Sequence, residues 1–84
     1  MEKEESKTNL YRDYLKDLST LLRDTAENAM KEWEKEQSGF NSGQLMAYHQ
    51  VLSLMVEQAE AFQIRLKDVG LETIDPDKYL AVKQ

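Results

Sequence analysis

The sequence predicts an all-α fold: an antiparallel hairpin of two helices with a short C-terminal helical tail, which dimerises into a four-helix bundle. Apolar residues recur at steps of three and four along two long segments. Glycines interrupt this pattern at 39, 43 and 70, and no stretch alternates between apolar and polar residues as a half-buried strand does. We therefore expect one hairpin over residues 8–70 and a tail over residues 71–84.

The composition limits the possible functions. The chain has 84 residues, a formal net charge of −5 and no cysteine. Disulfides, thiolate zinc sites and thiol catalysis are therefore excluded for this chain, and self-association is the remaining way to stabilise so small a core. The acidic charge disfavours phosphate backbones and anionic membranes, and no apolar run approaches the roughly 20 residues of a membrane span. We expect a cytoplasmic protein with no membrane contact.

The first helix is expected over residues 8–37, after a charged N-terminus, residues 1–7, that we expect to be disordered. Ser6 or Thr8 can cap it. Its opposite face carries charged residues such as Glu27 and Lys31, which are spaced to pair across one turn and should face water. On a helical wheel one buried stripe contains Tyr11, Leu15, Leu18, Leu22, Ala26, Ala29 and Trp33, with Tyr14 and Leu21 at its edge.

The connection between the helices is short. Gly39 can take the left-handed conformation that ends a helix, and Asn41 can cap the next helix with Gln44 three residues later. Phe40 and Leu45 then flank the cap as a hydrophobic staple. A connection of this length makes the two helices antiparallel and adjacent.

The second helix, expected over residues 42–69, carries an unbroken heptad pattern. Gly70 should end it, with Leu71 touching Leu66 beyond the stop. The predicted hairpin core consists of Leu15, Leu18, Leu22, Leu45, Tyr48, Leu52, Met55, Ala59, Phe62 and Leu66.

A second row on this helix predicts the dimer interface. Its members are displaced to one side of the heptad seam: Ala47, Val51, Leu54, Gln58 and Ala61. One partner helix covers only the seam, so a lone hairpin would leave this row in water. No formally charged residue occurs from Gln37 through Val56, which also places this helix inside an assembly. A homodimer is the simplest solution; a larger oligomer or a hetero-complex would also cover the row, and a monomer would not.

The tail allows two interpretations. Asp75 and Pro76 suit the cap and the first position of a short helix over residues 76–82, which is too short to stand alone. The tail either folds back on its own bundle, with Leu71 or Ile74 against Ile64, or binds a partner protein.

Candidate chemistry is sparse. His49 is the only histidine, and position 46 holds Met where a Glu-x-x-His metal motif needs Glu. The simpler interpretation of His49 is a partly buried, hydrogen-bonded imidazole with a structural role. The more specific alternative is a pH-sensitive interface that contains this imidazole. No serine or threonine has the partners of a nucleophile. We therefore expect no enzymatic activity, no metal and no cofactor.

The expected function is a non-enzymatic homodimeric module for protein–protein interaction, with an unidentified protein partner. The alternative is a small nucleic-acid-binding regulator, because Arg12, Lys16 and Arg23 share one side of the first helix. Acidic neighbours such as Asp13 and Asp17 would weaken phosphate attraction, so nucleic acid is the less favoured partner.

Overall fold

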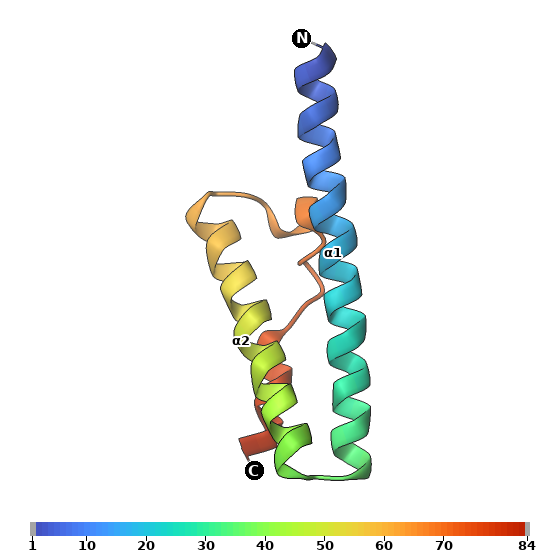
Figure 1. Ribbon diagram of the computed structural model, residues 1–84. Helices are drawn as coiled ribbons and strands as arrows, with labels where there is room; N and C mark the ends of the chain where they lie inside the picture. Colours follow the sequence, from blue (N-terminus) through green and yellow to red (C-terminus); the bar gives the residue numbers. More distant parts are fainter. Residues whose placement is uncertain (1, 84) are drawn as a thin grey trace.

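The computed structural model describes the backbone of residues 2–83 and the side chains of residues 9–80. Its elements are α1 (Glu2–Lys35), α2 (Gly39–Ala61) and two 3-10 segments, η1 (Leu66–Val69) and η2 (Pro76–Lys83). Figure 1 shows α1 and α2 side by side as an antiparallel hairpin, with the first turns of α1 projecting beyond the end of α2. The prediction of an all-α hairpin with a short helical tail is confirmed.

The N-terminal end of α1 differs from the expectation for residues 1–7. The helix begins at Glu2, whereas the sequence predicts disorder up to residue 7 and a helix from residue 8; Met1 lies outside the described residues. The physical reason is that Glu and Lys, which dominate this segment, are good helix formers. The charged composition of this segment is therefore compatible with helix, and α1 begins earlier than the sequence analysis predicted.

The turn forms three residues earlier than predicted. Ser38 caps α2, and its Oγ accepts a 3.1 Å hydrogen bond from the backbone N–H of Asn41. Gly39 is the first residue of α2 and is not in the left-handed region. Asn41, the predicted cap, instead donates through Nδ2 to the carbonyl of Glu36 at 2.8 Å, which satisfies an acceptor at the end of α1. Phe40 is 77% exposed, so the predicted staple does not form.

Helix α2 ends eight residues before the predicted end at residue 69. Gln63 is left-handed, with φ 59°, and its N–H donates to Glu60 while the N–H of Ile64 donates to Ala59 at 2.8 Å. These two bonds form a Schellman stop with a glutamine where glycine is usual. The heptad pattern therefore does not continue as one helix, and Phe62 is 72% exposed at its end.

The stop predicted at Gly70 is present, but it ends η1. Gly70 has φ 77°, and the N–H of Leu71 donates to the carbonyl of Leu66 at 2.8 Å. A Cβ at Gly70 would lie 3.0 Å from the carbonyl oxygen of Lys16, so this turn packs directly on the backbone of α1. Only glycine meets both requirements without strain.

The tail docks on its own hairpin. Segment η2 runs back along α2 and buries Tyr79, which is only 2% exposed; Ile74, just before η2, is half-buried. Ile64, the residue expected beneath the tail, is instead 40% exposed. The main core consists of Ala26, Ala29, Met30, Leu45, Leu52 and Tyr79. A second cluster, Ala59, Val69 and Leu71, closes the end away from the turn. The tail thus covers one side of the hairpin.

Candidate interaction surface

On the covered side, one carboxylate joins the tail to α1. Glu27 Oε2 accepts a 2.7 Å hydrogen bond from the hydroxyl of Tyr79 and lies 2.6 Å from Nζ of Lys78. The hydrogen bond from Lys78, followed by that from Tyr79, lowers the pKa of Glu27. Burial and the bond to Glu27 raise the pKa of Tyr79. The expectation that Glu27 merely faces water is therefore wrong, because the tail returns over it.

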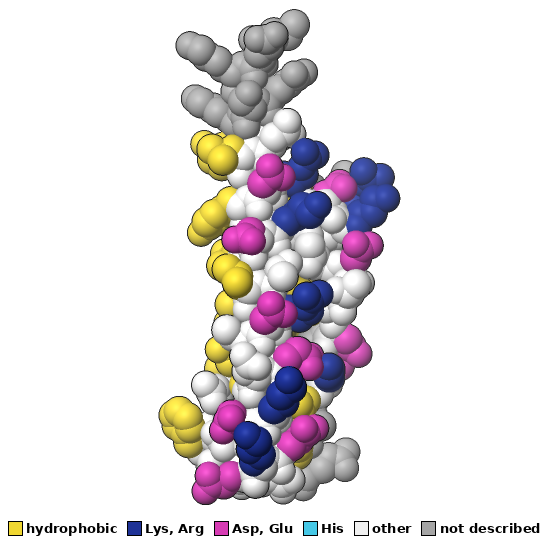
Figure 2. Space-filling view, turned by 90° about the vertical axis from the view of Figure 1, so that its right-hand side faces the viewer, with side chains coloured by type: hydrophobic (Ala, Val, Ile, Leu, Met, Phe, Trp, Pro, Cys, Tyr) yellow, Lys and Arg dark blue, Asp and Glu magenta, His cyan; other side chains and the backbone are white. Residues whose placement is uncertain are grey.

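Both helices also expose large apolar side chains that the tail does not cover. On α1, Leu10 is 65% exposed, Tyr14 64% and Leu21 55%; on α2, Val51 is 42% exposed and Leu54 58%. We call these five residues the apolar face. Figure 2 shows hydrophobic side chains along one edge of the molecule, beside a surface of mixed acidic and basic residues. Exposed apolar residues in such numbers are typical of an interaction site.

The spacing of the apolar residues along each helix places them on one side of that helix. Leu10, Tyr14 and Leu21 lie four and seven residues apart, which places them on one side of α1. The five residues predicted for the dimer interface are all exposed: Ala47, Val51, Leu54, Gln58 and Ala61. The row on α2 is therefore uncovered in the single chain, as the sequence predicted. Tyr14 and Leu21, which the sequence analysis placed at the edge of the buried stripe of the first helix, are exposed instead.

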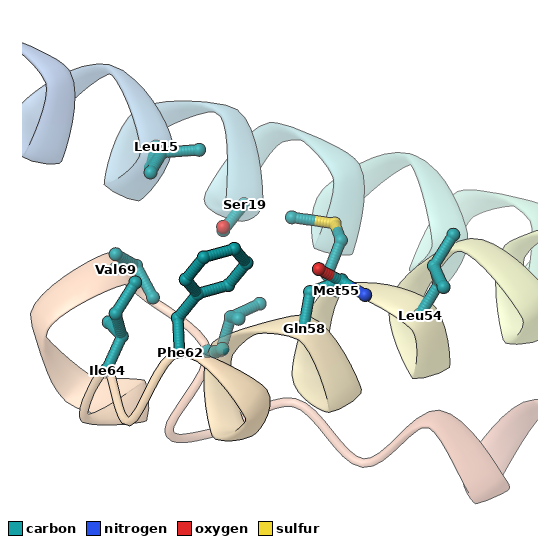
Figure 3. Close-up of a pocket in the computed structure, with 10 residues that line it drawn as sticks. Leu15, Ser19, Leu54, Met55, Gln58, Phe62, Ile64 and Val69 are labelled. Atoms are coloured by element: carbon teal, nitrogen blue, oxygen red, sulfur yellow. The ribbon is translucent and has the colours of Figure 1, made fainter.

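A hollow of about 300 Å³ opens between α1 and α2, near the end of α2. Leu15 and Ser19 line it from α1, and Leu54 and Phe62 line it from α2, as Figure 3 shows. Its walls are otherwise hydrocarbon except for Gln58. Ser19 is fully buried, and its Oγ has no hydrogen-bond partner among the described residues. An unpaired buried hydroxyl in an apolar wall is uncommon, since nearly all such groups find a partner.

The predicted hairpin core is only partly buried in the structure. Leu45, Leu52 and Ala59 are buried. Leu15 and Phe62 are the exceptions: both are exposed because they border the hollow where the helices diverge. The remaining predicted members are half-buried: Leu18, Leu22, Tyr48, Met55 and Leu66.

Tyr79, Met30 and Ser19 are the site and core residues that the sequence analysis missed. Met30 extends the buried stripe by one step of four from Ala26 and could have been found on the wheel. Tyr79 is set by how the tail folds back, which no local pattern encodes.

His49 is half-buried, and its Nδ1 lies 2.9 Å from the carbonyl oxygen of Pro76. This contact joins α2 to the tail and agrees with the interpretation of a hydrogen-bonded structural imidazole. Within the described part of the chain, no group of three or more His, Asp or Glu side chains is arranged to hold a metal ion.

The basic residues of α1 are not gathered into one positive surface. Arg12 donates to Asn9 at 2.8 Å, and Arg23 bonds to Thr73 of the tail at 3.2 Å and lies 3.5 Å from Asp24. Lys16 borders a shallow hollow that is lined equally by basic and acidic side chains: Arg12, Asp13, Lys16, Lys67, Asp68 and Glu72. Such mixed charge gives little net attraction for a phosphate backbone.

Comparisons with protein-family models, with curated proteins and with solved structures found no significant match to this chain. Across residues 2–83, the helices contain no apolar stretch long enough to cross a lipid bilayer.

Proposed function

We propose that the protein is a non-enzymatic interaction module that acts as a homodimer, in which two copies cover each other's apolar face. The observation that supports this is the exposure of Leu21 and Leu54, at 55% and 58%, on the side of the hairpin that the tail leaves open. Complete burial of a large apolar side chain contributes about 1.5–3 kcal/mol. The five side chains of the apolar face are 42–65% exposed, so covering each of them contributes about half of that and favours association.

The size of the face suits a dimer. Helix α2 has 23 residues and is therefore about 34 Å long at 1.5 Å per residue. Its exposed row runs from Ala47 to Ala61, 14 residues or about 21 Å along the helix, so a second hairpin can pack lengthwise on it. A pair of hairpins joined in this way makes the predicted four-helix bundle.

The dimer would leave the charged side of α1 free for a further protein partner. That side carries both acidic and basic residues such as Asp17, Asp24 and Lys31, which are exposed. Since the tail is occupied with its own core through Tyr79, the outer side of α1 is the better candidate for such contacts.

The first experiment is to measure mass by light scattering at micromolar concentration. The native chain should give about twice 9.8 kDa, and Leu54→Glu should give the monomer mass, because a carboxylate at the centre of the face would have to be desolvated. Thr20→Glu, which adds the same charge at an exposed position of α1, is the control and should remain dimeric. A native chain that is monomeric at this concentration contradicts the proposal.

A further inference from the structure

The tail is held on the hairpin by side chains rather than by backbone pairing. Beyond Leu71 its backbone hydrogen bonds are local: the N–H of Ile74 donates to Leu71 at 3.2 Å, and the N–H of Lys78 donates to Asp75 at 3.1 Å. In the described part of the chain, its hydrogen bonds to the two helices involve three helix side chains: Arg23, Glu27 and His49. The helices therefore select the tail by its side chains and by one carbonyl group.

Two consecutive tail residues converge on one carboxylate of α1. Glu27 Oε2 accepts a hydrogen bond from the hydroxyl of Tyr79 at 2.7 Å and lies 2.6 Å from Nζ of Lys78. A carboxylate can accept several hydrogen bonds at once, and its bond to a cationic donor is stronger than a neutral one. A single acidic residue of α1 therefore recognises both a lysine and the tyrosine that follows it.

The ring of Tyr79 packs among small side chains of α1. It is 2% exposed and belongs to the main core with Ala26 and Ala29, which are 0% and 4% exposed. Three residues earlier, the carbonyl oxygen of Pro76 lies 2.9 Å from Nδ1 of His49 on α2. Since a carbonyl oxygen only accepts, the imidazole is the donor in this bond. Contacts from both helices thus fix the direction of the bound segment.

The chain is anchored on α1 before the tail begins. Leu71 is 2% exposed within the second cluster, and the turn at Gly70 packs on the backbone of Lys16. Between this anchor and Tyr79, three tail residues are exposed: Glu72, Thr73 and Asp75. The tail can therefore leave the helices as one unit while η1 and its stop at Gly70 remain in place.

We infer that the part of α1 and α2 that holds the tail is a peptide-binding site, and that it accepts a segment of a partner protein in which lysine is followed by tyrosine. The chain's own tail occupies this site otherwise. A tethered segment competes at an effective concentration on the order of 1 mM, so the partner binds the fraction of molecules whose tail is released. The inference does not depend on the proposed dimer, because the contacts of Lys78 and Tyr79 involve none of the five residues of the apolar face.

A synthetic peptide of residues 72–84, labelled with a fluorophore, tests the site in the full chain by fluorescence anisotropy. Tyr79→Ala removes the buried ring of the chain's own tail, so this variant should bind the peptide at least about tenfold more tightly than the native chain. Circular dichroism checks that the variant is still helical. Tyr79→Phe, which keeps the ring, is the second variant and should bind the peptide about three- to tenfold more tightly than the native chain, the effect of one hydrogen bond.

A double-mutant cycle tests the role of Glu27. A peptide carrying Tyr79→Phe should bind the Tyr79→Ala chain about three- to tenfold more weakly than the native peptide does. When the chain also carries Glu27→Ala, the two peptides should bind equally, because the acceptor of the hydroxyl is gone. Asp17→Ala is the matched control: it removes an exposed carboxylate ten residues earlier on α1 and should leave the difference between the peptides unchanged.

Three results would overturn the inference. The first is a helical Tyr79→Ala chain that does not bind the peptide at millimolar concentration, together with a Tyr79→Phe chain that binds it no better than the native chain. The second is a difference between the two peptides that persists with Glu27→Ala. The third is a native chain that is dimeric in light scattering and a helical Tyr79→Ala chain that is monomeric, which would assign the site to the tail of a second copy. A native chain that is monomeric contradicts only the proposed dimer.

Discussion

The hydroxyl of Tyr79 gives the most direct measure of how firmly the tail is held, because a single atom can be removed. Tyr79→Phe keeps the ring, which is 2% exposed, and deletes only the 2.7 Å hydrogen bond to Glu27. The carboxylate of Glu27 keeps Lys78 as a partner at 2.6 Å. The substitution therefore isolates the contribution of one charged hydrogen bond to the docking of the tail.

The expected magnitude follows from the environment of this bond. A hydrogen bond to a charged group contributes about 1.5–3 kcal/mol to folding. The side chain of Glu27 is 36% exposed, so water can replace part of the lost interaction, and we expect a loss of about 1–2 kcal/mol in the free energy of unfolding. For a chain of 84 residues, each 1 kcal/mol lowers Tm by about 4–8 °C.

Urea unfolding followed by circular dichroism measures this loss, with all variants at one protein concentration because self-association would make the stability depend on concentration. Lys78→Ala is the control: its ion pair with Glu27 is 49% exposed on the lysine side and should contribute about 0.2–1 kcal/mol. A Tyr79→Phe chain as stable as the native one, or a larger loss for Lys78→Ala, would show that the tail is not held by the buried hydroxyl.

Two further predictions follow from the same structure. The pKa of Glu27 is lowered on folding, so the contribution of its carboxylate to stability is complete above the unfolded pKa of about 4.3 and is lost as the pH falls through the lower folded pKa. The difference in unfolding free energy between the native chain and Tyr79→Phe should therefore shrink below about pH 4. Urea titrations at several pH values measure this difference. Gly70→Ala should destabilise the chain by about 1–3 kcal/mol, since φ is 77° and the new Cβ would lie 3.0 Å from the Lys16 carbonyl oxygen. Gly43→Ala, inside α2 with open space around it, should stabilise the chain by up to about 1 kcal/mol. Equal effects of the two substitutions in thermal melts would contradict this account.

The sequence predicted the features that depend on local periodicity. The steps of three and four defined two helices, and the row through Val51 and Leu54 lies exposed on α2. The sequence also predicted the helix stop at Gly70, because a left-handed glycine followed by Leu71 ends a helix whether that helix is α or 3-10.

The ends of the helices were less predictable, since several residues compete for each cap. Ser38 and Asn41 are both residue types that favour the N-cap position. In the structure Ser38 caps α2, whereas the Asn41 side chain bonds to the end of α1. Gln63 carries no signal for a left-handed stop, so the end of α2 at Ala61 could not be read from the chain.

Periodicity along the sequence therefore determined which residues share a helix side and that α2 carries a second, largely apolar row beside its buried one. Only the tertiary structure decided which sides the tail covers. It placed Tyr79 on Glu27, buried Ser19, and left Leu21 and Leu54 exposed. The physical reason is that a helix pattern fixes directions within one element, whereas the approach of a non-helical tail depends on the packing of residues about 50 positions apart.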